Sequence, residues 1–269
     1  MKTCFVKRVG GLLACTVVAV TGVVATGAHA APLLPVTFNP GVFAPSNPTF
    51  TADKLNLLDF SRVDATGPAI GGGTAFSERG FLQVNNTSLV DNTFNPTGNR
   101  TAYNLYLGFT GTGVQNASSF NSSSLGTFTA LHYTLYGVNG ASSFGIDASN
   151  NPFVTNAAGT TVADLAQGDL IAGTASFSAN PIGAGANLSA TYIRDLAGFI
   201  VSPAQATLNL QGAFNNDANI VTVINGGAGF TLNGGGGDVT FNTVPVPEPL
   251  SIALLGTGLL GLGFVRRNC

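Results

Sequence analysis

In the stretch Tyr103-Asn104-Leu105-Tyr106-Leu107-Gly108-Phe109, every second residue from Tyr103 is large and apolar, so these side chains share one face of an extended chain. The same spacing returns at Leu131, Tyr133 and Leu135. Alternation with a period of two is typical of a strand with one buried face. Further segments of this kind, separated by clusters of Gly, Asn, Ser and Pro, are 125–129, 169–177, 187–192, 206–210, 220–224 and 239–241. This pattern predicts an all-β protein, folded as a single β-sandwich-like domain with Gly/Asn-rich loops.

The composition restricts the functions that the chain can have. It contains 269 residues, of which 36 are Gly and only 8% are charged. With 10 Lys and Arg against 12 Asp and Glu, it lacks the excess positive charge that nucleic-acid binding requires. Its 45% hydrophobic residues, 19 Phe among them, are enough to bury a core, which excludes wholesale disorder. We therefore expect a secreted, strand-rich surface protein that binds no nucleic acid.

Residues 1–30 have the organisation of a secretory signal peptide. Positive charge comes from Lys2, Lys7 and Arg8, and an apolar run follows at 9–24. Ala28-His29-Ala30 then has the spacing of small residues that signal peptidase requires. Cleavage between Ala30 and Ala31 would leave residues 31–244 as a secreted, β-rich cargo domain.

Residues 245–269 combine three features in order. Val246-Pro247-Glu248-Pro249 is followed by an apolar run at 250–265 and then by Arg266-Arg267. Sixteen helical residues extend about 24 Å, which is short of a hydrocarbon core of about 30 Å. We therefore expect a short transmembrane helix that is inserted only transiently in the inner membrane. Its arginines favour the cytoplasmic side.

This C-terminal combination resembles the PEP-CTERM sorting signal of Gram-negative bacteria that produce exopolysaccharide. The resemblance implies recognition by an exosortase, a membrane-bound protease and transpeptidase, with Pro247, Glu248 and Pro249 as the recognition element. It also implies processing near this motif and delivery to the cell surface or extracellular matrix.

The cargo resembles a second group, the flocculation-associated PEP-CTERM proteins. The resemblance rests on Phe50-Thr51-Ala52-Asp53-Lys54, Tyr103-Asn104-Leu105-Tyr106 and Asp169-Leu170-Ile171-Ala172-Gly173. It implies a non-catalytic matrix protein that associates with exopolysaccharide and supports flocculation or biofilm formation.

Few residues of the cargo could carry catalysis. Its only histidine is His132 and its only glutamate is Glu78, and it has no G-x-S-x-G nucleophile turn. One histidine cannot build a catalytic zinc site. Cys4, Cys15 and Cys269 all lie in the two terminal segments, so the cargo has neither a disulfide nor a thiol nucleophile. We therefore expect that the cargo is not an enzyme. The alternative is a secreted carbohydrate-active enzyme with a pair of carboxylates that the sequence does not single out.

Calcium is a further alternative, although no cofactor is required. Two loops place oxygen-bearing side chains two residues apart, and their candidate ligands are Asp147 and Asn151 in the first and Asp217 and Asn219 in the second. A third loop of this kind begins at Asp91. None has the glycine that the EF-hand loop requires at its sixth position. Threonine pairs, such as Thr127 and Thr129, leave an ice-binding adhesin as another alternative.

Three smaller expectations complete the sequence analysis. Tyrosines are suited to an exposed sugar-stacking patch because a hydroxyl tolerates water, and the candidates are Tyr103, Tyr106, Tyr133, Tyr136 and Tyr192. The glycine-rich segment 226–237 is expected to be a loose approach to the C-terminal tail. Short helices or single turns are expected at 162–167 and 193–198.

Overall fold

The computed structural model describes residues 33–69, 73–90, 92–192, 198–203 and 208–242. The predicted signal peptide with Ala28, Ala30 and Ala31, the predicted tail 245–269, and Asp91 lie outside these residues. The strands and the two short 3-10 helices are, in chain order, β1 (Val36–Phe38), η1 (Pro40–Val42), β2 (Phe50–Ala52), β3 (Lys54–Pro68), β4 (Thr74–Leu89), β5 (Asn92–Phe94), β6 (Asn104–Gln115), β7 (Ser124–Val138), β8 (Ser142–Ile146), β9 (Pro152–Asn156), β10 (Val162–Ala179), β11 (Ile182–Tyr192), β12 (Ile200–Ser202), β13 (Leu208–Asp217), β14 (Val221–Ile224), η2 (Asn225–Gly227) and β15 (Gly229–Asn242). No helix in the described part of the chain is long and apolar enough to cross a membrane.

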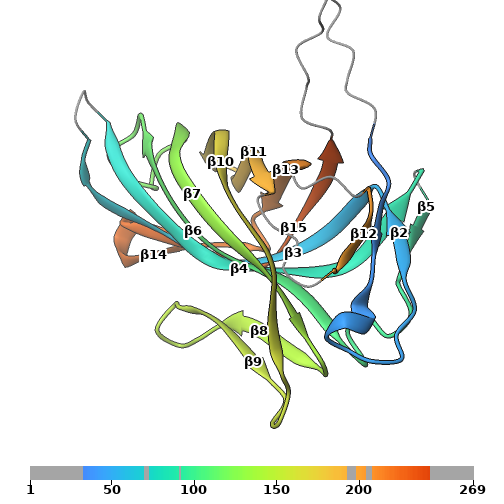
Figure 1. Cartoon of the computed structure of the whole chain (residues 1–269). Helices are drawn as coiled ribbons and strands as arrows, with labels where there is room; N and C mark the ends of the chain where they lie inside the picture. The colour runs from blue at the N-terminus through green and yellow to red at the C-terminus, as the bar shows by residue number, and fades with distance from the viewer. Residues whose placement is uncertain (1–32, 70–72, 91, 193–197, 204–207, 243–269) are drawn as a thin grey trace, which may run out of the picture. The chain divides into compact units, whose positions relative to one another are not determined.

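Eight strands form a closed antiparallel barrel (Figure 1). The barrel strands are β3, β4, β6, β7, β10, β11, β13 and β15, and each pairs with the next one along the chain. The pairing of β15 with β3 closes the ring. This is the up-and-down arrangement, in which neighbours in sequence are neighbours in space. The all-β prediction is confirmed.

The prediction of a β-sandwich is wrong. A sandwich has two separate sheets, each with free edges, whereas here the main sheet joins its own edge through the pairing of β15 with β3. Strand alternation shows which side chains face inward, but it is the same for a sandwich and for a barrel. The barrel strands are also long, up to 18 residues in β10, and long strands can curve around a common interior.

One of the two predicted helical turns is also wrong. Residues 162–167, expected to form a helical turn, are the start of β10. A register shift between Asp164 and Ala166 interrupts the pairing with β7 there, so Leu165 and Ala166 are both buried. Two consecutive buried residues imitate helical spacing. In the other predicted turn, residues 193–197 lie outside the described part of the chain.

The glycine-rich segment is a barrel strand, which corrects the prediction of a loose approach to the tail. Most of 226–237 belongs to β15. Gly234 has φ of 79°, and the register with β3 shifts between Asn233 and Gly235, as in a β-bulge. At Gly237, a Cβ atom would collide with the ring of Phe214 on β13. The glycines therefore allow close packing at the place where the barrel closes.

Two apolar clusters occupy the two ends of the barrel. At the first end, Phe38 of β1 contacts Phe50, Phe199 and Phe241 at ring-centroid distances of 5.0, 5.3 and 5.6 Å. This cluster includes residues of the small sheet β12-β1-β2. At the second end, the rings of Phe120, Phe177 and Phe230 pack together at 4.9–5.5 Å.

A hairpin of β8 and β9 covers part of the outer face of the barrel. Phe144 of β8 packs against Phe60 of β3 and Tyr106 of β6 at 5.8 and 5.4 Å between ring centroids. At the hairpin tip, the guanidinium of Arg62 donates hydrogen bonds to the carbonyl oxygens of Ser149 and Asn150 at 3.3 and 3.4 Å. The hairpin therefore covers outward-facing side chains of β3, and this explains why one of them, Phe60, is apolar.

Candidate functional site

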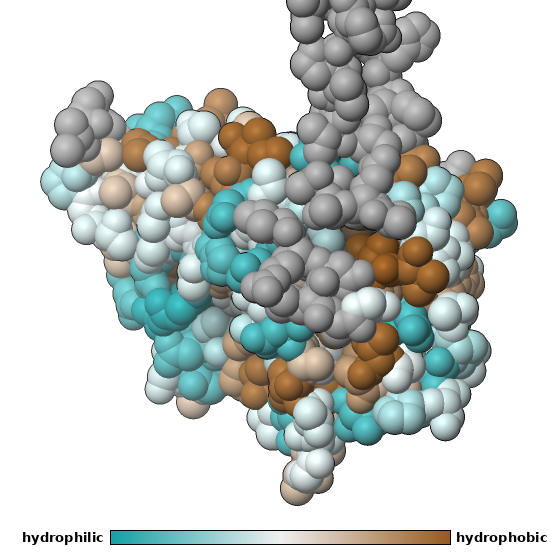
Figure 2. Space-filling view, viewed as in Figure 1, coloured by the Kyte–Doolittle hydropathy of each residue, from teal (hydrophilic) through white to brown (hydrophobic). Residues whose placement is uncertain are grey.

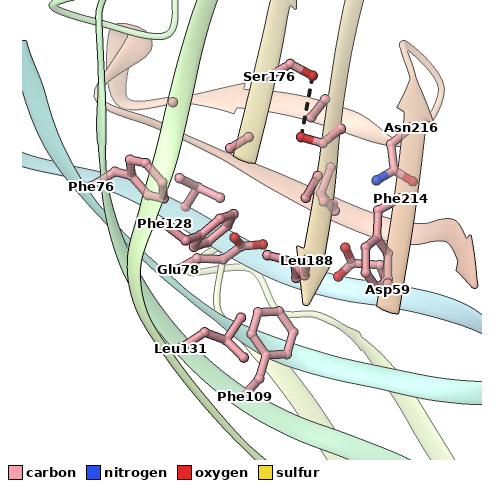
Figure 3. Close-up of a pocket in the computed structure, with 18 of the residues that line it drawn as sticks. Asp59, Phe76, Glu78, Phe109, Phe128, Leu131, Ser176, Leu188, Phe214 and Asn216 are labelled. Carbon is pink, nitrogen blue, oxygen red and sulfur yellow. Dashed lines mark hydrogen bonds between the residues drawn. The ribbon is translucent and has the colours of Figure 1, made fainter. Parts of the chain in front are cut away.

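The barrel encloses a cavity of about 100 Å³, which all eight barrel strands line. Its walls are mainly apolar (Figure 3), with contributions from Phe76, Phe109, Phe128, Leu188 and Phe214. Eight-stranded barrels have an interior that is either filled by side chains or holds one small ligand. Two acidic side chains also line this cavity.

Asp59 of β3 and Glu78 of β4 both point into this cavity (Figure 3). In the pairing of the two strands, Ser61 lies opposite Gly80, with Asp59 and Glu78 on the diagonal across it. The Ser61 hydroxyl donates a hydrogen bond to Glu78 Oε1 at 3.3 Å. A Cβ atom on Gly80 would collide with Ser61 and with the carbonyl oxygen of Phe60. Glycine at position 80 therefore allows the two strands to approach closely beside the acids.

Burial changes the acidity of this pair. It raises the pKa of Asp59 to about 7 and that of Glu78 to about 8, and the negative charge of Asp59 adds to the rise at Glu78. Hydrogen bonding to Ser61 opposes both increases. Among the residues that line the cavity there is no Lys, Arg or His. The pair therefore titrates near neutral pH and gains its negative charge without a cationic partner in the cavity wall.

Two buried polar atoms in the cavity wall have no hydrogen-bond partner. They are Oδ1 of Asp59 and Nε2 of Gln115. The exposed fractions of these two residues are only 4% and 3%. The other side-chain atom of Gln115, Oε1, accepts a hydrogen bond from the Ser124 hydroxyl at 2.9 Å. Most buried polar groups in proteins are paired, so these two atoms mark the interior as unusual.

A second hollow, of about 410 Å³, lies along the ends of the strands that follow β6. Its lining mixes polar residues, among them Asn116, Ser123 and Asn215, with apolar ones such as Leu125 and Phe177. The residues that line both this groove and the cavity are Ser124, Ser176, Phe177, Ala184 and Gly185. Ser176 donates to the carbonyl oxygen of Gly185 at 3.5 Å, the bond drawn in Figure 3. The groove is therefore continuous with the cavity wall at the second end of the barrel.

The structure places His132 away from the acid pair. His132 is exposed on β7, and its Nδ1 lies 2.9 Å from Oδ1 of Asp169 on the adjacent strand β10. His132 is thus an exposed strand residue whose ring is hydrogen-bonded to Asp169. The partner of Glu78 is instead Asp59, a pairing that the sequence analysis did not single out.

The loop oxygens proposed for calcium stabilise turns. Asp147 Oδ1 accepts the backbone N–H groups of Ser149 and Asn151, each at 2.8 Å, and these bonds lower the pKa of Asp147. Asn151 Oδ1 accepts hydrogen bonds from Arg62 and Arg79.

In the second loop, Asp217 Oδ1 accepts the N–H of Asn219 at 3.0 Å. The described residues contain no group of three or more His, Cys, Asp or Glu side chains that could hold a metal ion. Calcium binding at Asp147, Asn151, Asp217 and Asn219 stays a prediction.

The predicted tyrosine patch is wrong, because most of these side chains are inside the protein. Tyr103, Tyr106, Tyr133 and Tyr192 have exposed fractions of 0%, 4%, 4% and 3%. Tyr133 faces the interior and donates a hydrogen bond to the carbonyl oxygen of Thr191 at 2.9 Å. Tyr106 is covered by Phe144 of the outer hairpin. The alternating positions that predict strands, Tyr103 and Tyr133 among them, are therefore buried in the fold.

The exposed face of the barrel is instead rich in hydroxyl and amide groups. We call this surface the polar wall, and it consists of the exposed residues Thr110, Thr112, Thr127, Thr129, Thr174, Asn187 and Gln211 on strands β6, β7, β10, β11 and β13. Thr174 pairs with Thr127 on one side and with Asn187 on the other. The hydroxyls of Thr112 and Thr129 lie 3.2 Å apart. The wall therefore presents rows of neutral hydrogen-bonding groups to solvent.

Hydrophilic and weakly hydrophobic residues also dominate the face shown in Figure 2, where strongly hydrophobic residues form separate patches. The large exposed apolar side chains of the described residues include Leu125 and Ile171, which lie on the same strands as the polar wall. Scattered exposed apolar residues are ordinary on protein surfaces.

Comparison with known families finds the PEP-CTERM protein-sorting motif at residues 245–267. This confirms the predicted resemblance, and the matched range includes Val246, Pro247, Glu248, Pro249, Arg266 and Arg267. No curated protein and no solved structure matches the chain. PEP-CTERM proteins are exported and sorted to the cell surface, so the motif implies that this protein is exported and sorted by an exosortase.

Proposed function

We propose that this exosortase substrate is a non-catalytic protein of the extracellular matrix, which associates with exopolysaccharide through its polar wall and supports flocculation or biofilm formation. The sorting motif at 245–267 carries the proposal, because it directs the barrel to the surface where such polymers accumulate. Signal peptidase would act before Ala31, and the exosortase near Glu248.

The chemistry of the polar wall suits a carbohydrate partner. Sugar rings present many hydroxyl groups, which pair with neutral donors and acceptors such as Thr127, Thr174 and Asn187. These three residues lie in register across β7, β10 and β11. Rigid strands hold them at fixed spacing, which lowers the entropy cost of binding an extended polymer.

A non-catalytic role agrees with the position of the acids. Asp59 and Glu78 are the carboxyl pair that the structure brings together, but they lie inside a cavity of about 100 Å³ with mainly apolar walls. Glycoside hydrolysis needs a carboxyl pair on either side of the scissile bond of a bound sugar chain. A cavity of this size is too small for such a chain, so we assign the pair a different role.

The sorting motif leads to a prediction about processing. Replacement of Glu248 by Ala is expected to leave the full-length protein in the inner membrane, because the exosortase would lose the acidic residue of its recognition element. Cell fractionation combined with intact-mass measurement tests this, and Thr243→Ala, just outside the matched range, is the matched control. Unchanged mass and unchanged surface location of the Glu248→Ala protein would contradict the proposal.

The polar wall leads to a prediction about binding. The triple variant Thr127→Val/Thr129→Val/Thr174→Val keeps the shape and strand preference of each side chain but removes three exposed hydroxyls. We expect the fraction of exported protein that sediments with exopolysaccharide to fall several-fold. The control is Thr66→Val/Thr155→Val/Thr222→Val, which alters three exposed threonines outside the wall.

Equal binding by the two triple variants would show that the wall is not the polymer-binding surface. Release of reducing ends from the polymer by the wild-type protein would favour the alternative of a carbohydrate-active enzyme.

A further inference from the structure

We propose that the barrel cavity is a binding site for a small organic cation, an amine with an apolar body no larger than a single ring, whose ammonium group is held between Asp59 and Glu78. This site is distinct from the polar wall and does not depend on the proposed matrix role.

Unpaired polar atoms in the cavity wall are the first observation. Asp59 Oδ1 and Gln115 Nε2 lack a partner, although both side chains are more than nine-tenths buried and line the cavity. Leaving such groups unpaired costs free energy. Asp59 Oδ1 is an unpaired acceptor and therefore suits the N–H group of a bound ligand.

The charge balance is the second observation. Two carboxyl groups share the interior, and the residues that line it include no basic side chain. The nearest arginines on the same strands are used elsewhere, since Arg62 and Arg79 form ion pairs with Asp64. A buried carboxylate is either paired with a cation or neutralised by a proton. The cavity wall supplies no cation, so a positive charge that pairs with the ionised acids would come from a ligand.

The donor set favours an organic cation over a metal ion. Calcium takes 6–8 oxygen ligands and magnesium requires octahedral oxygen coordination. The cavity offers two carboxyls next to the Ser61 hydroxyl, and the rest of its wall is mainly carbon. An ammonium group needs only two or three acceptors. Its organic substituent would contact the apolar wall.

The aromatic residues define the body of the ligand. Phe76, Phe109, Phe128 and Phe214 line the cavity (Figure 3), and aromatic faces attract ammonium groups. Enclosed apolar cavities of about 150 Å³ take up benzene. The cavity here is smaller, about 100 Å³, but it shares five lining residues with the groove outside it. The groove provides a route of entry and additional room, so the ligand is limited to one ring or a short alkyl chain.

Titration of the full-length protein with benzylamine by calorimetry at pH 8.5 tests the proposal. Benzyl alcohol, which has the same ring but no charge, is the matched ligand. We expect benzylamine to bind at least tenfold more tightly than benzyl alcohol. This preference should decrease at pH 5.5, where Asp59 and Glu78 are protonated. Tyr133 is the other titratable group in the wall, and its hydroxyl is already bonded to Thr191.

The variant Asp59→Asn/Glu78→Gln identifies the site. It is expected to lose the preference for benzylamine while keeping its circular dichroism spectrum. Asp169→Asn, which alters an exposed acid on the outside of β10, is expected to bind like the wild type. Three results would overturn the proposal: no binding of benzylamine to the wild type, equal affinities for benzylamine and benzyl alcohol, or an unchanged preference in the double variant.

Discussion

The variant Asp59→Asn/Glu78→Gln is expected to be more stable than the wild type at pH 9, by on the order of 4 kcal/mol in the free energy of unfolding. At that pH both carboxyl groups are ionised inside the barrel, because burial raises their pKa values to about 7 and about 8. Asn and Gln have nearly the same shape as the acids but carry no charge. The variant therefore avoids the cost of holding two negative charges in the cavity, one on the buried Asp59 and one on the half-buried Glu78.

The pH dependence has a defined sign. At pH values below the ordinary carboxyl pKa, the pair is protonated in both the folded and unfolded states. Between about pH 4 and 8, the unfolded chain has released protons that the folded protein still holds. The free energy of unfolding of the wild type should therefore fall as pH rises through this range, and level off above it. The double variant should lack this decrease.

Urea denaturation at pH 4, 6, 7.5 and 9 measures the effect. The matched control is Asp164→Asn, which alters an exposed acid of β10 and should leave the pH profile of the wild type unchanged. A double variant with the same pH profile as the wild type, or with lower stability at pH 9, would show that the acids are not buried as a pair.

Replacement of Gly168 by Val is expected to destabilise the barrel by about 3–5 kcal/mol, which combines overpacking with the loss of a buried hydrogen bond. Gly168 of β10 lies opposite Tyr133 of β7 in the pairing. The Tyr133 ring passes over Gly168 to reach the carbonyl oxygen of Thr191 on the following strand, β11. A Cβ atom at position 168 would collide with both the ring and that oxygen.

Gly236→Val is the matched control, because Gly236 is an exposed glycine of a barrel strand with no atom within 4 Å of its Cβ position. Tyr133→Phe separates the two contributions, because it removes the hydrogen bond but keeps the ring. We expect it to lower the free energy of unfolding by about 1–2 kcal/mol. The midpoint of urea unfolding gives each value. If Gly168→Val unfolded at the same midpoint as Gly236→Val, the packing of Tyr133 across β10 would be incorrect.

Strands with one covered face could be predicted from the sequence, and strands covered on both faces could not. In β6 and β7, the alternation at Leu105, Leu107, Leu131 and Leu135 corresponds to side chains that point into the barrel. In β3, Phe60 faces outward but is covered by Phe144. The apolar residues of β3 therefore do not alternate, and the strand was missed.

The acid pair was missed for the same reason. Asp59 has the same parity in β3 as Leu55 and Leu57, which are both buried, and Glu78 has the parity of Phe76 and Leu82 in β4. An acidic residue at an inward position is the signal that could have identified each of them. Recognising that signal requires the strand assignment first. Their proximity further depends on the pairing of β3 with β4, which a single sequence does not specify.

Closure of the sheet into a barrel could not be predicted from the sequence, for a related reason. It depends on the pairing of β15 with β3 and β13, and β15 contains the glycine-rich segment. Glycine has a low intrinsic preference for strands. At Gly237, however, the absence of a side chain makes room for Phe214. Local preference and tertiary packing therefore disagree in β15, and packing prevails.

The account is tested most directly by co-sedimentation of the exported protein with exopolysaccharide from the producing cells, with calcium and with a calcium chelator. We predict saturable binding in both conditions and no release of reducing ends, because the neutral groups of the polar wall bind without a metal. Binding only in calcium would assign the interaction to the Asp147 or Asp217 loops. No binding in either condition would contradict the proposed matrix function, although the protein would remain an exosortase substrate.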